Sequence, residues 1–428
     1  MKLWIKRQIM ARATDLDRRD LARVRARARR ETTGAPRVLH YFHRFGDPAS
    51  ALMAPLMIRL AQRFDVTVCT RLTGLPEKAV APEPEQLEAV ARADTARLAK
   101  LFGLGFADPG ASPAQARIIE AEALAAAAVL GDEDALPQIT ALDAALWSGA
   151  ALPAGSGPGG SGDRDRALKA GTRARDALGH FQSGAVEFEG EWYWGADRLH
   201  YLETRLDDDG ARIAGEGFLA PPLLESQARG DAGGAVIEVY PSLRSPYTYL
   251  AMERVYALAR RWNARVELYP VLPMVMRKLP VPQRKAMYFL KDCAREAERL
   301  ALSFGTISDP VGAPTERGLA VLLRAMESGQ GEAFITAFLE AAWSEAINAG
   351  SDGGLKEICA RAGVPWADAQ AALNGDSWRP RVEANRHRLT GLGLWGVPSF
   401  RVGDLSVWGQ DRLFLVEAEL QGIAGARS

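Results

Sequence analysis

The chain has 428 residues with 53 basic and 53 acidic side chains, so its formal net charge is zero. This length predicts two or three domains, and the balanced charge argues against a polyanionic partner such as nucleic acid. The three cysteines, Cys69, Cys293 and Cys359, lie far apart without a Cys-x-x-Cys pair. They therefore argue against a disulfide framework and against a metal site.

Residues 1–36 are rich in arginine with interspersed aspartates, which predicts one or two exposed helices or a partly ordered basic arm. A membrane-surface or nucleic-acid role for this arm is the less favoured interpretation. Charges interrupt residues 1–30 too often for a secretory signal, and the Ala-rich stretch 121–130 is too short to span a membrane. We therefore expect a cytoplasmic protein without a membrane association.

An internal repeat begins at residue 37. Four matches occur in the same order in both copies, and they pair 37–48 with 235–246, 97–103 with 299–305, 139–148 with 335–344, and 194–199 with 408–413. Four ordered matches are hard to obtain by chance. We therefore predict two domains of one fold, at 37–206 and 235–428, joined by a linker at 207–234 that contains Gly and Pro.

The second copy opens with a strand, a tight turn and a helix. Val236, Ile237 and Val239 predict a buried strand, and Ser245 followed by Pro246 is a well-formed helix start. The positive end of a helix stabilises an anion such as a thiolate. A capping role alone is the competing interpretation of Ser245.

A matching group of motifs lies near the C-terminus. Val397-Pro398 precedes a short strand at 399–402, and Gly403-Asp404 predicts a hairpin turn into a second strand at 405–408. A closing helix is then expected after Gly409.

Three motifs of the second copy, Ser-Pro-Tyr at 245–247, Gly-Val-Pro at 396–398 and Gly-Gln-Asp-Arg-Leu at 409–413, resemble those of the kappa-class glutathione transferases and the 2-hydroxychromene-2-carboxylate isomerases. These are thioredoxin-fold proteins of the DsbA superfamily, and the resemblance covers residues 235 to about 420. With the repeat, it implies an α/β chain of two thioredoxin-like domains. Each would have a small mixed sheet and an inserted helical subdomain, and the bond before Pro398 would be cis.

The resemblance also implies a glutathione site. Ser245 would donate a hydrogen bond to the glutathione sulfur and lower the pKa of its thiol. The backbone of Val397, next to Pro398, would pair with the cysteinyl unit as a strand pairs with a peptide.

The remaining glutathione contacts are implied for three further side chains. Gln410 and Asp411 would hold the amine and carboxylate of the γ-glutamyl group, and Lys285 resembles the cation for the glycyl carboxylate. The competing interpretations are capping for Gln410 and Asp411 and a solvated helix face for Lys285.

The first copy lacks the features that would carry chemistry. Asp47 stands where the second copy has Ser245, and a carboxylate there would repel a bound thiolate. No proline precedes its hairpin at 183–187. We therefore predict a degenerate first domain, with chemistry confined to the second.

The predicted function is a glutathione-dependent isomerase or transferase acting on a conjugated small molecule. The alternative is a non-catalytic thioredoxin-fold protein that binds glutathione, a peptide or a partner. Thiol-disulfide exchange is disfavoured because no cysteine lies at the first-helix site, and the five histidines show no metal-ligand spacing. Proteins of the kappa-like class are often dimers, so a homodimer is a further expectation.

Overall fold

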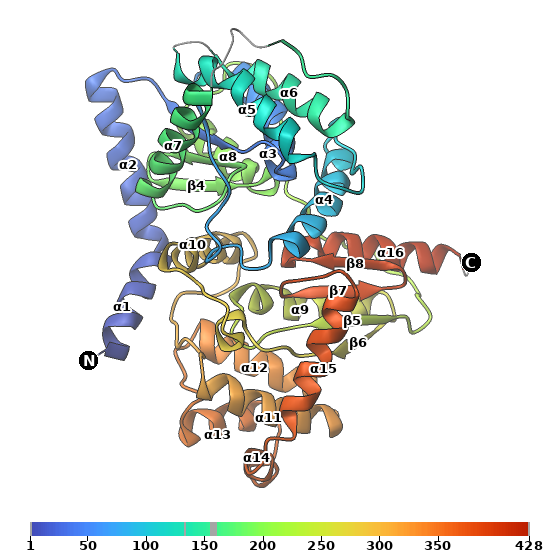
Figure 1. The fold of residues 1–428 in the computed structure, drawn as a ribbon. Helices are drawn as coiled ribbons and strands as arrows, with labels where there is room; N and C mark the ends of the chain where they lie inside the picture. The colour runs from blue at the N-terminus through green and yellow to red at the C-terminus, as the bar shows by residue number, and fades with distance from the viewer. Residues whose placement is uncertain (1, 132–133, 155–160, 427–428) are drawn as a thin grey trace. The chain divides into compact units, whose positions relative to one another are not determined.

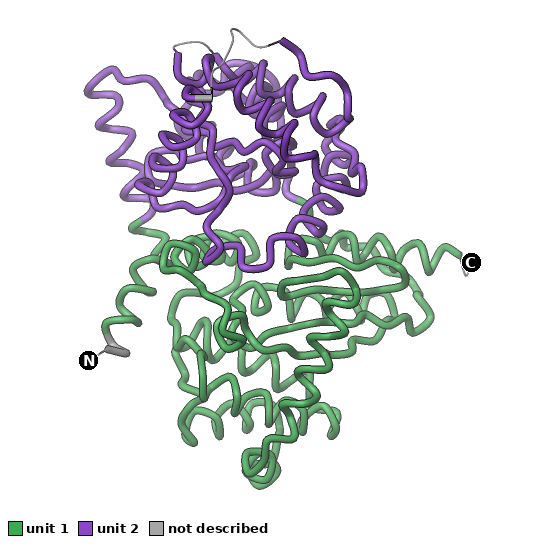
Figure 2. The backbone as a smooth tube through the Cα atoms, in the orientation of Figure 1, with its two compact units in different colours: residues 1–18, 223–428 green, residues 19–222 purple. Residues whose placement is uncertain are grey.

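The computed structural model describes residues 2–131, 134–154 and 161–426. The chain divides into two compact units (Figure 2), unit 1 with Met1–Arg18 and Leu223–Ser428, and unit 2 with Arg19–Pro222. The predicted domain boundaries at 36/37, 206/207 and 234/235 stay predictions. Within the described residues, no helix is long and apolar enough to cross a membrane.

Each unit contains one four-stranded mixed sheet. The order is β2-β1-β3-β4 in unit 2 and β6-β5-β7-β8 in unit 1. In both sheets the first strand pairs in parallel with the second and antiparallel with the third. The strands are β1 (Val38–His43), β2 (Thr67–Leu72), β3 (Ala185–Phe188), β4 (Glu191–Trp194), β5 (Val236–Tyr240), β6 (Arg265–Leu268), β7 (Ser399–Val402) and β8 (Leu405–Trp408).

The strand registers agree with the repeat in the sequence. Val38 pairs with Thr67 in unit 2, and Val236 pairs with Arg265 in unit 1, so the two parallel pairs have the same register. A three-residue 3-10 helix follows the last strand of each sheet, η1 (Ala196–Arg198) and η3 (Gln410–Arg412). The predicted fold class, two thioredoxin-like α/β domains with inserted helices, is confirmed.

The helical insertion lies at the same place in both units, between the second and third strands of each unit (Figure 1). These strands are β2 and β3 in unit 2 and β6 and β7 in unit 1. In unit 2, α3 packs on β1 and β2, and α8 packs on β4. The helices of this unit are α3 (Pro48–Arg63), α4 (Pro84–Leu101), α5 (Gln115–Leu130), α6 (Leu136–Ser148), α7 (Ser161–Ala177) and α8 (Leu199–Asp208).

In unit 1, α9 and α16 pack against the sheet, and α11 to α15 form a helical layer that packs on α9 through α12 and contributes buried aromatic side chains such as Phe334 and Phe338 to the same core. The short helix η2 (Met274–Arg277) is the first helical element of this insertion. The helices are α9 (Pro246–Arg261), α10 (Gln283–Arg299), α11 (Ala313–Glu327), α12 (Gly331–Trp343), α13 (Asp352–Arg361), α14 (Trp366–Leu373), α15 (Trp378–Gly391) and α16 (Leu413–Gly425).

The basic N-terminal segment forms two helices, α1 (Lys2–Thr14) and α2 (Leu16–Thr33). Helix α1 packs on α10 of unit 1, and Met10 lies in the unit 1 core.

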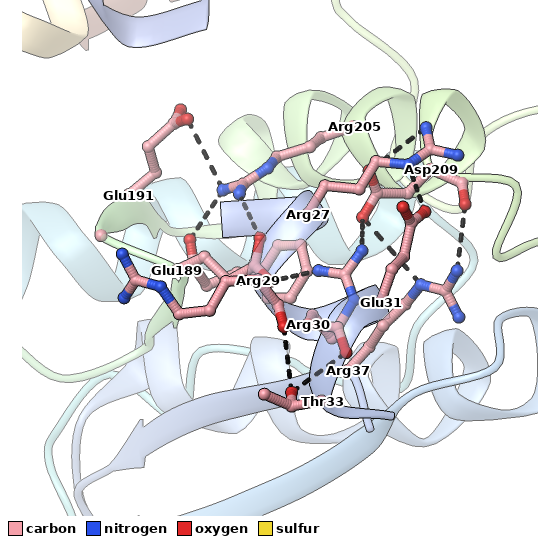
Figure 3. Close-up of polar contacts among 12 residues, drawn as sticks. Arg27, Arg29, Arg30, Glu31, Thr33, Arg37, Glu189, Glu191, Arg205 and Asp209 are labelled. Carbon is pink, nitrogen blue, oxygen red and sulfur yellow. Dashed lines mark hydrogen bonds and ion pairs between the residues drawn. The ribbon is translucent and has the colours of Figure 1, made fainter. Parts of the chain in front are cut away.

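Two arginines of α2, Arg23 and Arg30, are paired with carboxylates of unit 2. Arg23 donates to Glu191 at 2.5 and 2.7 Å. Arg30 pairs with Glu189 and, at 2.5 Å, with Asp209, as Figure 3 shows. Arg205 joins the same cluster through Glu189 at 2.7 Å. These guanidinium groups are neutralised within the protein, so they do not form a phosphate-binding face.

Two equivalent glutamates anchor the irregular segment that joins the sheets. Glu203 in α8 accepts hydrogen bonds from the backbone of Leu219 at 3.0 and 3.1 Å, and Glu417 in α16 accepts one from Ser226. Each glutamate is the fifth residue of its helix. The predicted linker region is therefore tied to the last helix of each repeat.

Candidate functional site

The site is built around the start of α9. Ser245 is the N-cap, and its hydroxyl oxygen accepts a hydrogen bond from the backbone N–H of Thr248 at 3.2 Å. Pro246 in the first turn lacks an N–H and has the φ that a helix requires, so it favours a helix at this point. The half-buried hydroxyl keeps its own proton for a further acceptor.

That acceptor comes from the loop before β7. The Ser245 hydroxyl lies 3.5 Å from the carbonyl oxygen of Val397, and the Val397–Pro398 bond is cis, as the resemblance implied. The backbone N–H of Gly409 donates to the Pro398 carbonyl at 2.9 Å. The structure therefore brings Ser245, the Val397-Pro398 pair and the start of η3 together from three distant parts of the sequence.

The close packing of the Trp408 side chain on this loop requires a glycine at position 396. A Cβ on Gly396 would lie 2.1 to 2.3 Å from three atoms of the Trp408 indole. This indole also packs on Trp395, with 5.8 Å between the ring centroids. The indole thus occupies the volume that any larger side chain at 396 would need.

We expect Gly396→Ala to destabilise unit 1 by about 1–3 kcal/mol, because the indole must move out of a packed position. Gly391→Ala is the matched control. It lies in α15 with no heavy atom within 4 Å of its added Cβ, so it should be neutral or stabilise by up to about 1 kcal/mol. Denaturant unfolding measures both, and equal stability of the two variants would contradict the packing argument.

Lys285 is buried beside this loop, with 6% of its surface exposed. Its ammonium nitrogen lies 5.8 Å from the ring centroid of Phe289 and 6.0 Å from that of Trp395. Burial lowers the pKa of Lys285 to about 8. The competing prediction of a solvated helix face is therefore wrong, because α10 packs this side chain against aromatic rings.

Gln410 is buried, and its amide is held from both sides. Its Nε2 donates to Glu296 at 2.7 Å, and its Oε1 accepts from Arg254 at 2.5 Å. Arg254 also makes a two-point contact with Glu225 at 2.6 and 3.2 Å. This chain of partners was missed from the sequence, because bonded members are separated by up to 156 residues and follow no motif.

Gln410→Ala tests how much this chain contributes to stability, and unit 2 already has alanine at the equivalent position, Ala196. The substitution leaves Glu296 and Arg254 each without one buried partner. We expect a loss of about 1–3 kcal/mol in the free energy of unfolding, measured in denaturant. Unchanged stability would show that the contacts contribute nothing and would favour a role in ligand binding alone.

Asp411 is closer to the surface than Gln410. Its carboxylate lies 3.2 Å from the guanidinium of Arg412, and 18% of its side chain is exposed.

A second set of contacts joins α9 to α10. Tyr247 donates to Asp292 at 2.8 Å, and Arg295 donates to the other oxygen of Asp292 at 2.6 Å. These contacts fix α10 against the first turn of α9.

In unit 2 the equivalent position is filled by the chain itself. Asp47 caps α3 and accepts hydrogen bonds from Ser50 at 2.7 and 3.2 Å and from the Ser183 hydroxyl at 2.8 Å. A Cβ on Gly184 would lie 3.0 Å from the backbone of Ala49 and Ser50. The protein's own carboxylate and backbone therefore occupy the helix start that unit 1 leaves to a neutral hydroxyl.

A mixed four-stranded sheet with a cis-proline loop facing a helix start defines unit 1 as a thioredoxin-like fold. Serine takes the helix-start position, and no cysteine lies between 241 and 250. In the described part of the chain, no group of three or more His, Cys, Asp or Glu residues could hold a metal ion.

Residues 236–421 match the family described as a DSBA-like thioredoxin domain, and this part of the chain is a DsbA-like thioredoxin domain. Two relatives are 2-hydroxychromene-2-carboxylate isomerases. The protein from Sphingobium xenophagum is 26% identical over 195 residues, covering 43% of this chain and 97% of its own. The one from Pseudomonas putida is 21% identical over 191 residues, covering 43% and 94%.

Two solved structures are also similar. A 2-hydroxychromene-2-carboxylate isomerase has 19% identity and a TM-score of 0.39, covering 45% of this chain and 97% of its own. The cytosolic disulfide reductase DsbM from Pseudomonas aeruginosa, solved with GSH, has 17% identity and a TM-score of 0.34, covering 45% and 98%.

Proposed function

We propose that unit 1 is a glutathione-dependent isomerase or transferase that acts on a conjugated small molecule. The observation that carries this proposal is the Ser245 hydroxyl, placed at the start of α9 and 3.5 Å from the Val397 carbonyl. A neutral donor at a helix start stabilises an added thiolate. The names of the two isomerase relatives support the same chemistry.

The residues present fit a small peptide thiol. The backbone N–H of Val397 has no hydrogen-bond partner in the part of the chain that the structure describes. An extended peptide could therefore accept a hydrogen bond from this N–H without breaking a hydrogen bond within the protein. In this proposal Lys285 binds the glycyl carboxylate. Asp411 and Gln410, at the start of η3, bind the amine and carboxylate of the γ-glutamyl group.

Bound glutathione would supply a thiolate for conjugate addition and elimination. Ser245 gives up its 3.5 Å contact with the Val397 carbonyl and donates its hydroxyl proton toward the sulfur, which keeps the thiolate form favoured. Pro398 and Val397 orient the peptide, and Lys285 stays cationic below its pKa of about 8. Unit 2 takes no part in this chemistry, since Asp47 and Gly184 fill its equivalent position.

The second candidate function is a non-catalytic binding module of the same fold. The observation that favours it is the Gln410 amide, whose Oε1 and Nε2 are already bonded to Arg254 and Glu296, so a ligand would compete with these partners. The expected cytoplasmic location and homodimer are likewise predictions.

Calorimetry of the full chain with glutathione tests the proposal. We expect one glutathione bound per chain, and weaker binding as the pH rises through 8, because Lys285 then loses its charge. Lys285→Met should remove this pH dependence. Absence of binding at millimolar glutathione would reject the catalytic proposal and favour the binding module.

A further inference from the structure

Arg244, the residue before Ser245, is held by a carboxylate from a distant loop. Its Nε donates to one oxygen of Asp309 at 2.9 Å, and its Nη2 donates to the other at 3.1 Å. Burial alone would raise the pKa of Asp309, but the bonds and charges of Arg244 and Lys6 hold that pKa below its usual value. Asp309 is therefore ionised at neutral pH.

Helix α1 places a second cation on the same carboxylate. The ammonium of Lys6 lies 2.6 Å from Asp309. Arg7 also attaches α1 to unit 1, because it donates to the Ser308 hydroxyl at 3.2 Å and to the Ala346 carbonyl at 3.1 Å. Two cations and one carboxylate leave this cluster, Lys6, Asp309 and Arg244, with a net charge of +1.

The guanidinium of Arg244 keeps one edge open. Arginine has five N–H donors, and contact through Nε and Nη2 uses two of them. Nη1 has no hydrogen-bond partner among the residues that the structure describes, and 24% of the side chain is exposed. The Nη1 and Nη2 edge therefore retains the fork geometry that binds a carboxylate at two points.

The degenerate copy has lost the arginine of this pair. The repeat aligns Arg244 with Gly46, whereas Asp309-Pro310 has a counterpart in Asp108-Pro109. A Cβ on Gly46 would lie 2.6 Å from the end of the Ile118 side chain, so a larger residue at this position of unit 2 would have to displace Ile118. An arginine at this position thus occurs only in the copy that has serine at the helix start.

We propose that Arg244, oriented by Asp309 and Lys6, is the specificity-determining residue that binds the carboxylate of the ligand reacting beside Ser245. The inference rests on the proposed function for the identity of the reaction, but the recognition of an anion at Arg244 can be measured without glutathione. It also gives the N-terminal helix α1 a role in the site.

Ser245→Cys places a reporter thiol next to Arg244. We would compare its alkylation by iodoacetate, which carries a carboxylate, with that by iodoacetamide, its neutral counterpart. In both reactions the sulfur forms a bond to carbon and iodide leaves, so a change in thiol pKa cancels in the ratio of rates. Mass spectrometry of the peptide containing position 245 separates this site from the native cysteines.

We expect Arg244→Gln to lower the iodoacetate-to-iodoacetamide ratio by about two- to fivefold, the effect of one partly exposed charge contact. Lys6→Met should lower it about twofold, because the cluster then has no net charge. Arg244→Lys should retain part of the preference. Arg260→Gln, which removes an exposed pair with Glu332, is the control and should leave the ratio unchanged.

An unchanged ratio in Arg244→Gln, with the fold verified by its thermal unfolding, would overturn the inference. If Arg244→Gln fails to fold, the ratios of Lys6→Met and Arg244→Lys decide the question by the same criterion. Loss of glutathione binding in calorimetry with the ratio intact would reject the proposed function but not the role of Arg244.

Discussion

Ser245→Ala is expected to raise the pKa of glutathione bound to the full chain by about one to two units, because it removes a hydrogen bond to the developing thiolate. At neutral pH the thiolate fraction should then fall by roughly tenfold or more. The ultraviolet absorbance of the thiolate, followed across pH with saturating glutathione, measures this change. The same variant should lose most of its activity toward a conjugated acceptor.

The control for this variant is another serine cap of unit 1. Ser351 caps α13 and accepts a hydrogen bond from the backbone of Gly354 at 3.1 Å. Ser351→Ala should cost about 1 kcal/mol of stability, as Ser245→Ala also does, without changing the thiol pKa. Equal effects of both variants on the pKa would mean that Ser245 is a cap and nothing more.

Asp143→Asn is expected to change the pH dependence of unit 2 stability. Tyr41 donates its only hydroxyl proton to the Ser50 carbonyl at 2.9 Å, so the His43 Nδ1, 3.0 Å away, must donate to Tyr41. Burial lowers the pKa of His43 to about 3, which leaves Nε2 without a proton. Asp143, 3.2 Å from Nε2, must then supply the proton between them.

Burial raises the pKa of Asp143 well above its usual value, and neither of its oxygens accepts a hydrogen bond from the described residues. The folded pair therefore keeps one proton. Between about pH 4 and 6.5 the unfolded pair also holds one, on histidine, so stability is flat. Above about 6.5 the unfolded pair holds none, and stability should fall by up to about 1.4 kcal/mol per pH unit.

In Asp143→Asn the amide donates to Nε2 without titrating. The variant should be flat above about pH 6.5 and lose stability below it, where only the unfolded histidine takes a proton. Denaturant unfolding from pH 5 to 9 measures the difference between the two curves, with the exposed Asp65→Asn as control. Parallel curves for wild type and Asp143→Asn would contradict the assignment of the proton.

Local motifs were sufficient to predict the elements at the site. Ser245-Pro246 specifies a helix start by capping and by the φ of proline, and Gly403-Asp404 specifies the hairpin between β7 and β8. Both depend on neighbouring residues only, so the sequence carries them without tertiary context. The repeat likewise predicted two sheets of one topology, because matching sequences have matching patterns.

Contacts between distant segments could not be predicted in this way. Lys285 is predicted from the resemblance as a glutathione-binding cation, with a solvated helix face as the competing interpretation, and its burial depends on how α10 packs. The partners of Gln410 depend on where α9 and α10 place Arg254 and Glu296. A charged or amide side chain carries no sequence signal for a partner over a hundred residues away.

The sequence by itself determined the fold class, the two copies and the serine at the helix start of only one of them. Tertiary structure alone decided which groups surround that serine. It brought the Val397 carbonyl to Ser245, and it placed Lys6 and Asp309 behind Arg244. The reason is physical: capping and turn preferences act within a few residues, whereas burial and charge pairing depend on the packing of whole helices.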